Sequence, residues 1–299
     1  MSLAALASRP RAMAVLGALA IAFSAILVRL AEQPPSTSAF FRCLYALPVL
    51  GLLAWRENRR LGPRPRHSRR LAWAAGLLFA ADLIFWHHTI ENVGAGLGTV
   101  LGNLQVAMVP FVAWLALGEH PTRRVLGSLP LMLIGIVLIS GILEDGAYGS
   151  DPKLGVIFGV LTGLSYAGFL LILRAGGADL RRPAGPLYDA TLVATVAILL
   201  VGAPLGEMRL EPSWPAHGWL VVLALTSQVL GWLLITSSLP RLPAALSSVL
   251  LTIQPVGSVL LGIAIFSESP TALQVAGIIA VLSGLVAVSA RRAGPTQTA

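Results

Sequence analysis

One acidic side chain lies where an ionised carboxylate is costly. Asp82 falls near the centre of the apolar run 71–90. In a membrane-spanning helix an ionised Asp costs about 3 kcal/mol, so such residues face a bundle interior or a wet cavity and often relay protons. His87 lies further along the same run, and an unperturbed histidine changes charge near neutral pH. We expect Asp82 and His87 to be candidates for proton coupling. The alternatives are a protonated Asp82 that only binds a neighbouring helix and a structural, hydrogen-bonded His87.

Three amide side chains form the second candidate set. Gln105 and Gln254 fall at the same position of two similar segments, near the middle of apolar runs, and Asn103 is close to the first of them. An amide offers two donors and an acceptor, which suits a zwitterion or a polar metabolite. We expect these residues to line a substrate path. The alternative is an interhelical hydrogen bond that joins two helices.

Aromatic residues lie deep in three of the apolar runs. Trp86, Tyr166 and Trp232 are distant from the expected ends of their segments. Such rings can stack on a planar or apolar substrate group, although packing against lipid explains a single deep Trp equally well. We expect these rings to contact substrate.

Arg42 lies about one turn inside its apolar run, near one end. It is a candidate contact for a substrate carboxylate. The alternative is an interfacial anchor that pairs with Glu32 or Glu91. Pro110 and Pro255 each remove a backbone hydrogen bond within a run, so we expect them to be hinge points.

The elements that position these residues are hydrophobic helices. The chain of 299 residues is 56% hydrophobic and 11% charged, whereas a soluble domain carries about 25% charged residues. Runs of membrane-spanning length predict an all-α membrane protein with ten transmembrane helices. We place them near residues 12–31, 38–55, 71–90, 95–117, 123–143, 153–173, 186–204, 216–237, 243–266 and 271–290.

The chain also contains an internal repeat. Residues 94–140 recur without a gap as residues 243–289, with matches that include Gln105/Gln254, Glu119/Glu268, Pro121/Pro270 and Thr122/Thr271. Five helices per half is an odd number, so the second half enters the membrane from the opposite side. We expect two inverted five-helix repeats, 1–146 and 147–299, in one integral membrane unit. Each Glu-x-Pro-Thr reads as a turn with Glu near a helix N-terminus; a role in gating is the alternative.

The net charge of +8 is a topology signal. Most arginines fall in segments on the same side as the N-terminus, and only Arg29, Lys153 and Arg209 fall on the other side. This bias predicts that both termini are cytoplasmic in a multi-pass protein of the inner membrane. The partners we expect are the lipid bilayer and a small-molecule substrate, with no nucleic acid, and we expect a monomer.

Other classes of function find little support. Lys153, the single lysine, lies in no Gly-rich loop, so a Walker-type phosphate site is absent. The five histidines are scattered and Cys43 is the single cysteine, so we expect no metal and no cofactor. The acids lie mainly in loops without His partners, which argues against an intramembrane enzyme.

Short motifs resemble those of a known family. They are Leu117-Gly118-Glu119, its counterpart Phe266-Ser267-Glu268, Arg42 after Phe40-Phe41, and Pro255 thirteen residues before Glu268. The first half departs from the last feature, because Val106 stands there and Pro110 is displaced by four residues. Over the whole chain, the sequence resembles the drug/metabolite transporter superfamily. It is most similar to ten-helix EamA-type exporters, particularly the aromatic and neutral amino-acid exporters (YddG-like).

The resemblance implies a secondary transporter that exports amino acids or similar small metabolites across the inner membrane by alternating access. A multidrug exporter of lipophilic cations is the alternative, since Asp82 beside Trp86 offers an acid next to an aromatic ring. The exact substrate and the coupling ion stay open at this point.

Overall fold

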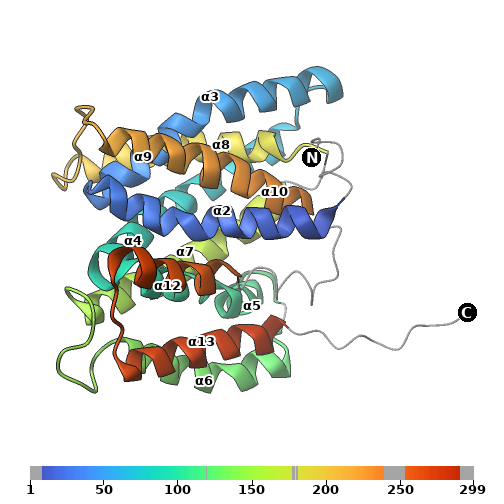
Figure 1. The fold of residues 1–299 in the computed structure, drawn as a ribbon. Coiled ribbons are helices and arrows are strands. Elements are labelled where there is room, and N and C mark those ends of the chain that lie inside the picture. The colour runs from blue at the N-terminus through green and yellow to red at the C-terminus, as the bar shows by residue number, and fades with distance from the viewer. Residues whose placement is uncertain (1–8, 119, 177–178, 180, 239–252, 290–299) are drawn as a thin grey trace, which may run out of the picture.

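The computed structural model describes residues 9–118, 120–176, 179, 181–238 and 253–289. Glu119 and residues 243–252, which belong to the sequence repeat, lie outside the described residues. The described chain consists of helices and the segments that connect them (Figure 1). The helices are α2 (Pro10–Ala31), α3 (Pro35–Leu61), α4 (Arg66–Gly102), α5 (Gln105–Leu117), α6 (Arg123–Ile139), α7 (Pro152–Gly176), α8 (Ala184–Gly202), α9 (Ala216–Leu223), the π-helical stretch η1 (Ala224–Gly231), α10 (Trp232–Ser238), α12 (Ile253–Phe266) and α13 (Ala272–Ser289).

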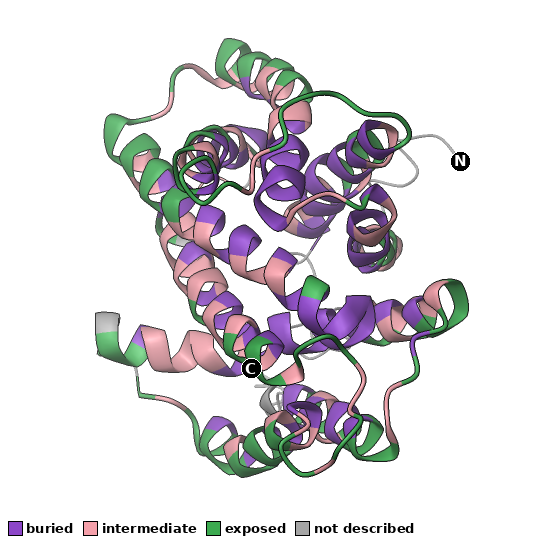
Figure 2. Ribbon diagram, turned by 90° about the vertical axis from the view of Figure 1, so that its left-hand side faces the viewer, coloured by how far each residue is buried: buried purple, intermediate pink, exposed green. Residues whose placement is uncertain are grey.

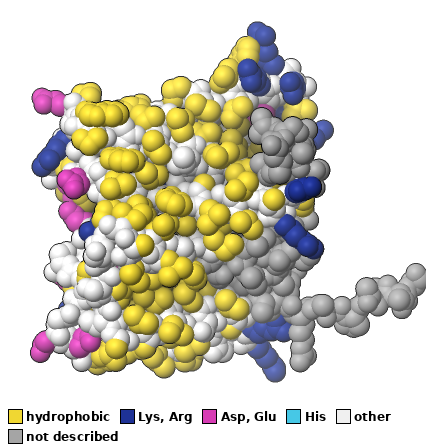
Figure 3. Space-filling view, in the orientation of Figure 1, with side chains coloured by type: hydrophobic (Ala, Val, Ile, Leu, Met, Phe, Trp, Pro, Cys, Tyr) yellow, Lys and Arg dark blue, Asp and Glu magenta, His cyan; other side chains and the backbone are white. Residues whose placement is uncertain are grey.

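The surface has an apolar middle and two charged ends. Six helical stretches in the described part are long and apolar enough to cross a membrane, and shorter apolar helices cover residues 105–115, 253–266 and 272–287. Figure 3 shows hydrophobic side chains across the middle of one face, with acids gathered at its left edge and most of the Lys and Arg at its right. We call these the acidic end (Glu32, Glu91, Glu144, Asp145, Glu207, Glu211) and the basic end (Arg56, Arg59, Arg60, Arg66, Arg69, Arg70).

Helix α4 contains a tight turn at Gly94. Its φ of 84° and ψ of 175° interrupt the helix, and this region of backbone conformation is essentially restricted to glycine. The two parts fold back on each other. A Cβ at Gly98 would lie 3.1 Å from Ile90 Cγ1, and one at Gly102 would lie 3.1 Å from Trp86 Cδ1. The helices predicted over residues 71–90 and 95–117 therefore meet at this turn. The second one is interrupted again between α4 and α5, which the sequence did not predict.

The helix predicted over residues 216–237 contains an irregular middle. Helices α9 and α10 are joined by η1, whose hydrogen bonds follow the π pattern. Such stretches are rare and occur frequently at functional sites. Here η1 buries Ser227 and Gln228, and the Ser227 hydroxyl donates to the Ala20 carbonyl of α2 at 2.9 Å.

Helices from the two halves of the chain pair in antiparallel fashion. In the α3–α8 pair, Gly202 lies against Ser36, and the Glu57 carboxylate accepts from Ala184 N at 2.9 Å and Gly185 N at 2.8 Å. Residue numbers therefore increase along α3 as they decrease along the facing side of α8, so the two helices run antiparallel.

The same holds for α6 and α13, which lie side by side at one edge of the bundle (Figure 1). A Cβ at Gly135 would lie 2.8 Å from Gly277 O, and Gly284 lies against Met132. Small residues let two backbones approach closely in this way.

Buried residues line the interior between the helices, whereas exposed residues cover the outward faces (Figure 2). One apolar cluster joins α2, α3, the first part of α4, and α8 to α10. A second joins the last part of α4 to α5, α6 and α13. The central polar residues lie where α2, α3, α4, α7, α10 and α12 meet.

Candidate functional site

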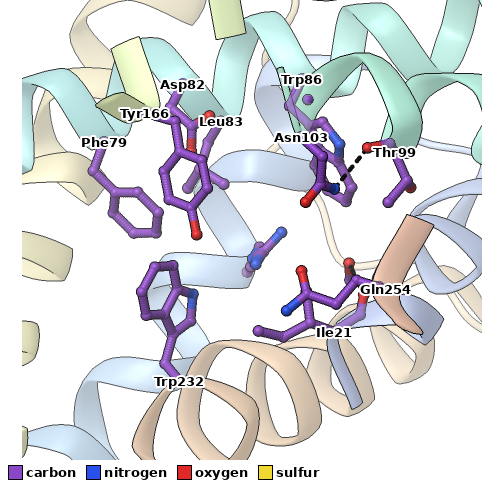
Figure 4. A pocket seen from close by; sticks show the side chains of 13 residues that line it. Ile21, Phe79, Asp82, Leu83, Trp86, Thr99, Asn103, Tyr166, Trp232 and Gln254 are labelled. Atoms are coloured by element: carbon purple, nitrogen blue, oxygen red, sulfur yellow. Dashed lines mark hydrogen bonds between the residues drawn. The ribbon is translucent and has the colours of Figure 1, made fainter. Parts of the chain in front are cut away.

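A cavity lies in the centre of the helix bundle. About 70 Å³ of it is open to the centres of water molecules, which is room for several waters. Figure 4 shows side chains converging on this space from opposite walls. Its lining residues are Ile21, Ser24, Arg42, Phe79, Asp82, Leu83, Trp86, Thr99, Gly102, Asn103, Tyr166, Trp232 and Gln254.

One side of the cavity is aromatic. Phe79, Tyr166 and Trp232 face the same space in Figure 4. The Trp232 ring meets Tyr166 edge to face with centroids 5.9 Å apart, and meets Phe79 in the same way at 6.2 Å. Behind them, Phe169 stacks on Phe79 at 4.6 Å. This cluster presents a rigid apolar wall with the geometry that aromatic groups prefer.

The other side of the cavity is rich in amide and hydroxyl groups. Asn103 and Gln254 approach it from α4 and α12 (Figure 4). Asn103 Nδ2 donates to the Thr99 carbonyl at 2.8 Å. The Thr99 and Ser258 hydroxyls lie 2.8 Å apart and join α4 to α12. The cavity therefore has an apolar side and a hydrogen-bonding side.

Opposite charges line this cavity. Arg42 is 4% exposed and Asp82 is 7% exposed, and both line the space. The Arg42 guanidinium donates through Nε to Gln228 Oε1 at 3.1 Å, and its Cζ lies 5.5 Å from the centre of the Trp86 ring. The head group of Arg42 is therefore buried beside η1 with Gln228 as its partner, rather than paired with Glu32 or Glu91 as the interfacial alternative expected.

Gln228 is a site residue that the sequence did not predict. It is fully buried, it accepts from Arg42, and its Nε2 donates to Thr191 Oγ1 of α8 at 3.3 Å. A polar residue within the apolar run 216–237 was the available signal. The π-helical turn that directs this residue inward has no recognisable pattern in a single sequence.

Most of the predicted site residues come together here, but two do not. Those that line the cavity are Asn103, Gln254, Tyr166, Trp86, Trp232, Asp82 and Arg42. Gln105 is buried near Gly163 of α7. Gln105 begins α5, after the interruption at Asn103, and is not among the residues that line the central cavity. Its contact with substrate stays a prediction.

His87 lies outside the central cavity, because a helix turns by about 100° per residue and its neighbour Trp86 faces inward. The His87 ring is 1% exposed, and Nδ1 lies 2.6 Å from the Leu83 carbonyl. His87 lines a separate pocket of about 820 Å³ at the acidic end. Trp86 and His87, adjacent residues of α4, thus face two different spaces.

The two predicted hinges occupy different surroundings. Pro255 is buried beside Gln254 near the start of α12, and Pro110 is partly buried within α5. Their role as hinges stays a prediction. In the part of the chain that the structure describes, three or more His, Cys, Asp or Glu side chains nowhere cluster as metal ligands would.

Apolar helices of spanning length around a central polar cavity are typical of membrane transport proteins. The sequence matches the EamA-like transporter family over residues 11–141 and 153–290. The chain therefore belongs to this family, whose members are integral membrane proteins that transport small molecules. This confirms the superfamily resemblance.

The chain is also similar to two other proteins. The chain is 29% identical over 282 residues to "Uncharacterized protein PA1977" of Pseudomonas aeruginosa, with 94% of each chain covered. A solved structure described as "Crystal structure of protein" superposes with a TM-score of 0.61 at 14% sequence identity, and covers 94% of this chain and 96% of that chain. The likeness to the solved structure concerns the fold alone.

Proposed function

We propose that this protein exports small zwitterions, with aromatic or neutral amino acids as the main candidates, across the inner membrane by alternating access. The observation that carries the proposal is the composition of one central cavity. It holds a buried cation, Arg42, and a buried acid, Asp82, between an aromatic wall and a pair of amides.

Each part of an amino acid has a matching group in this cavity. The carboxylate pairs with Arg42, because guanidinium–carboxylate hydrogen bonds are the strong, charge-assisted kind. The ammonium pairs with Asp82, and the side chain packs against Phe79, Tyr166 and Trp232. An aromatic amino acid needs more space than the cavity offers, so the walls must separate to admit it and close again around it.

The arrangement of the helices supports alternating access. Partners from the two halves pack antiparallel, as α3 with α8 and α6 with α13. The family matches the chain in two consecutive stretches of similar length. Both findings favour inverted repeats, in which one half rocks against the other around a central site. The distribution of arginine favours an acidic end that faces outward.

Lipophilic cations are the second candidate class of substrate. Asp82 among aromatic rings favours them, since cations bind to the faces of such rings. Arg42 in the same cavity disfavours them, because a cation there would meet a like charge. We therefore rank zwitterions first.

Transport into proteoliposomes tests the proposal. We expect uptake of one or more labelled amino acids, and no competition by a quaternary ammonium dye. Replacing Arg42 by Gln raises the KM for the amino acid by about tenfold or more, the loss expected for a hydrogen bond to a charged group. Uptake of the dye without uptake of any amino acid would overturn the proposal in favour of cation efflux.

A further inference from the structure

A buried carboxylate outside the central cavity is held by several donors. Glu268, in the turn between α12 and α13, is 3% exposed. Its Oε1 accepts from Ala95 N at 2.6 Å and from Arg29 at 2.5 Å, and its Oε2 accepts from Gly96 N at 3.0 Å. The sequence led us to expect a Glu near the start of the next helix. The carboxylate instead binds another helix, α4.

The two backbone donors are at a helix N-terminus. Gly94 interrupts α4, so Ala95 and Gly96 begin a new helical part whose first N–H groups have no partners within the helix. A negative charge is favourable at that position because of the helix dipole. Arg29 adds a full positive charge from the last turn of α2.

The backbone around this carboxylate is formed by glycines that have no space for a side chain of their own. A Cβ at Gly94 would lie 2.6 Å from Glu268 Oε1, and a Cβ at Gly96 would lie 3.1 Å from Oε2. Gly262 of α12 also lies against the carboxylate, so that a methyl group there would collide with it. Any side chain at these glycines would displace the Glu268 head group.

This contact lies between the two cavities. Thr99, about one turn beyond Ala95, lines the central cavity, whereas Gly94, Arg29 and Phe266 line the acidic-end pocket. The Arg29 guanidinium also lies 4.3 Å from the centre of the Phe266 ring. Glu268 therefore ties the end of α12 to α2 and α4 between the central cavity and the acidic-end pocket.

We propose that Glu268 is the gate residue that closes the central cavity toward the acidic end. Separation of α12 from α2 and α4 on that side must break all of its contacts, so the closed state depends on this carboxylate. The role in transport rests on the proposed function, but the closure itself is testable without any substrate.

Cysteine labelling measures the closure directly. In a Cys43→Ala background, Ser24→Cys places one thiol in the central cavity, and Asp145→Cys places one at the exposed acidic end. The side from which a membrane-impermeant maleimide labels Asp145→Cys identifies the acidic side of the membrane. The labelling rate of Ser24→Cys from that side then reports how often the gate opens.

Two different changes disturb the gate. Glu268→Gln removes the charge and places an NH₂ group against N–H donors, and Gly262→Ala keeps the charge but displaces it. We expect either change to raise the labelling rate of Ser24→Cys by about tenfold or more, as for the loss of a charge-assisted hydrogen bond. Glu211→Gln, at an exposed acid, and Gly127→Ala, where a methyl group meets open space, are the matched controls and leave the rate unchanged.

Unchanged labelling in both gate variants, or an equal increase in the controls, would overturn the proposal. Size-exclusion profiles identify a variant that does not fold, in which case Arg29→Gln replaces it. Transport gives a second readout. A gate residue changes the maximal rate but not the KM measured from the basic side, whereas damage to the central site changes the KM. If the protein does not transport amino acids but the gate variants still increase the labelling of Ser24→Cys, only the proposal on the substrate is rejected.

Discussion

The guanidinium of Arg42 is buried in the protein interior, where a charge without partners would be unstable. Gln228 accepts from its Nε, and Thr191 accepts from Gln228 in turn, so α3, η1 and α8 are joined by one hydrogen-bonded row. The row fixes the position of the cation relative to Asp82. At the scale of the residue, Gln228 is thus a positioning residue for the carboxylate contact that we propose.

Removal of Gln228 tests this role. We expect Gln228→Leu to raise the KM for an amino acid by about tenfold, because it removes one hydrogen bond to a charged group. We expect Gln228→Leu to change little in the uptake of the corresponding amine, which has the same side chain as the amino acid but no carboxylate. Thr226→Val, on the same helical stretch but with its hydroxyl bonded to Val222 O, is the control. An equal loss of uptake for the amino acid and for the amine would show that the role of Gln228 is only structural.

Asp82 carries the prediction on proton coupling. If its carboxylate carries the coupled proton, Asp82→Asn abolishes stimulation of transport by a pH gradient but keeps exchange of labelled for unlabelled substrate. The reason is that exchange requires binding and movement but no net proton transfer. If transport by Asp82→Asn depends on the pH gradient as strongly as transport by the wild-type protein, Asp82 has no role in coupling.

The sequence predicted the types of residue that lie in the central cavity, but it did not predict fully which candidates line it. Asp82 and Asn103 could be found because polar groups deep in apolar runs must find water or a partner. His87 lies outside the central cavity because it faces a different direction from its helix neighbour Trp86, and Gln105 lies outside it after the interruption at Asn103. Gln228 was missed because its direction depends on η1.

At the scale of the element, the turn at Gly94 is the feature with the strictest backbone requirement. It joins two helical parts, and it creates the N-terminus that Glu268 occupies. Helix positions followed from apolar runs, and the turn falls between two of them. The interruption at Asn103 and the π-helical η1 lie inside apolar runs, where hydrophobicity gives no signal.

Substitution of Gly94 tests the turn. We expect Gly94→Ala to lower the free energy of unfolding by about 1–3 kcal/mol, the cost of a backbone conformation that only glycine adopts readily. Thermal unfolding in detergent, followed by the fluorescence of the native tryptophans, measures the change. Gly127→Ala serves as the control, and an equal shift in both variants would contradict this explanation.

At the scale of the whole molecule, two halves share one interior. Helices α6 and α13 meet through glycines at one edge, and α3 and α8 meet along their length. Hydrophobicity predicted the helices, the internal repeat predicted that the halves are related, and family membership confirms a transporter. The pairing of particular helices depends on three-dimensional packing and was not predictable from one chain.

Orientation in the membrane is a prediction at this scale. We expect a maleimide added to intact cells to label Asp145→Cys at the acidic end, and to label Arg66→Cys at the basic end only after permeabilisation, in a Cys43→Ala background. The physical reason is that arginine-rich connections stay in the cytoplasm. The opposite pattern would overturn the predicted orientation.

The pair of opposite charges in the central cavity also has an electrical consequence. A zwitterion has no net charge, so its binding leaves the total charge of the cavity lined by Arg42 and Asp82 unchanged. Moving one elementary charge across the membrane is worth about 2.3 kcal/mol per 100 mV. Translocation of a zwitterion by itself therefore generates no current and is insensitive to voltage, whereas that of a lipophilic cation would be driven or opposed by it.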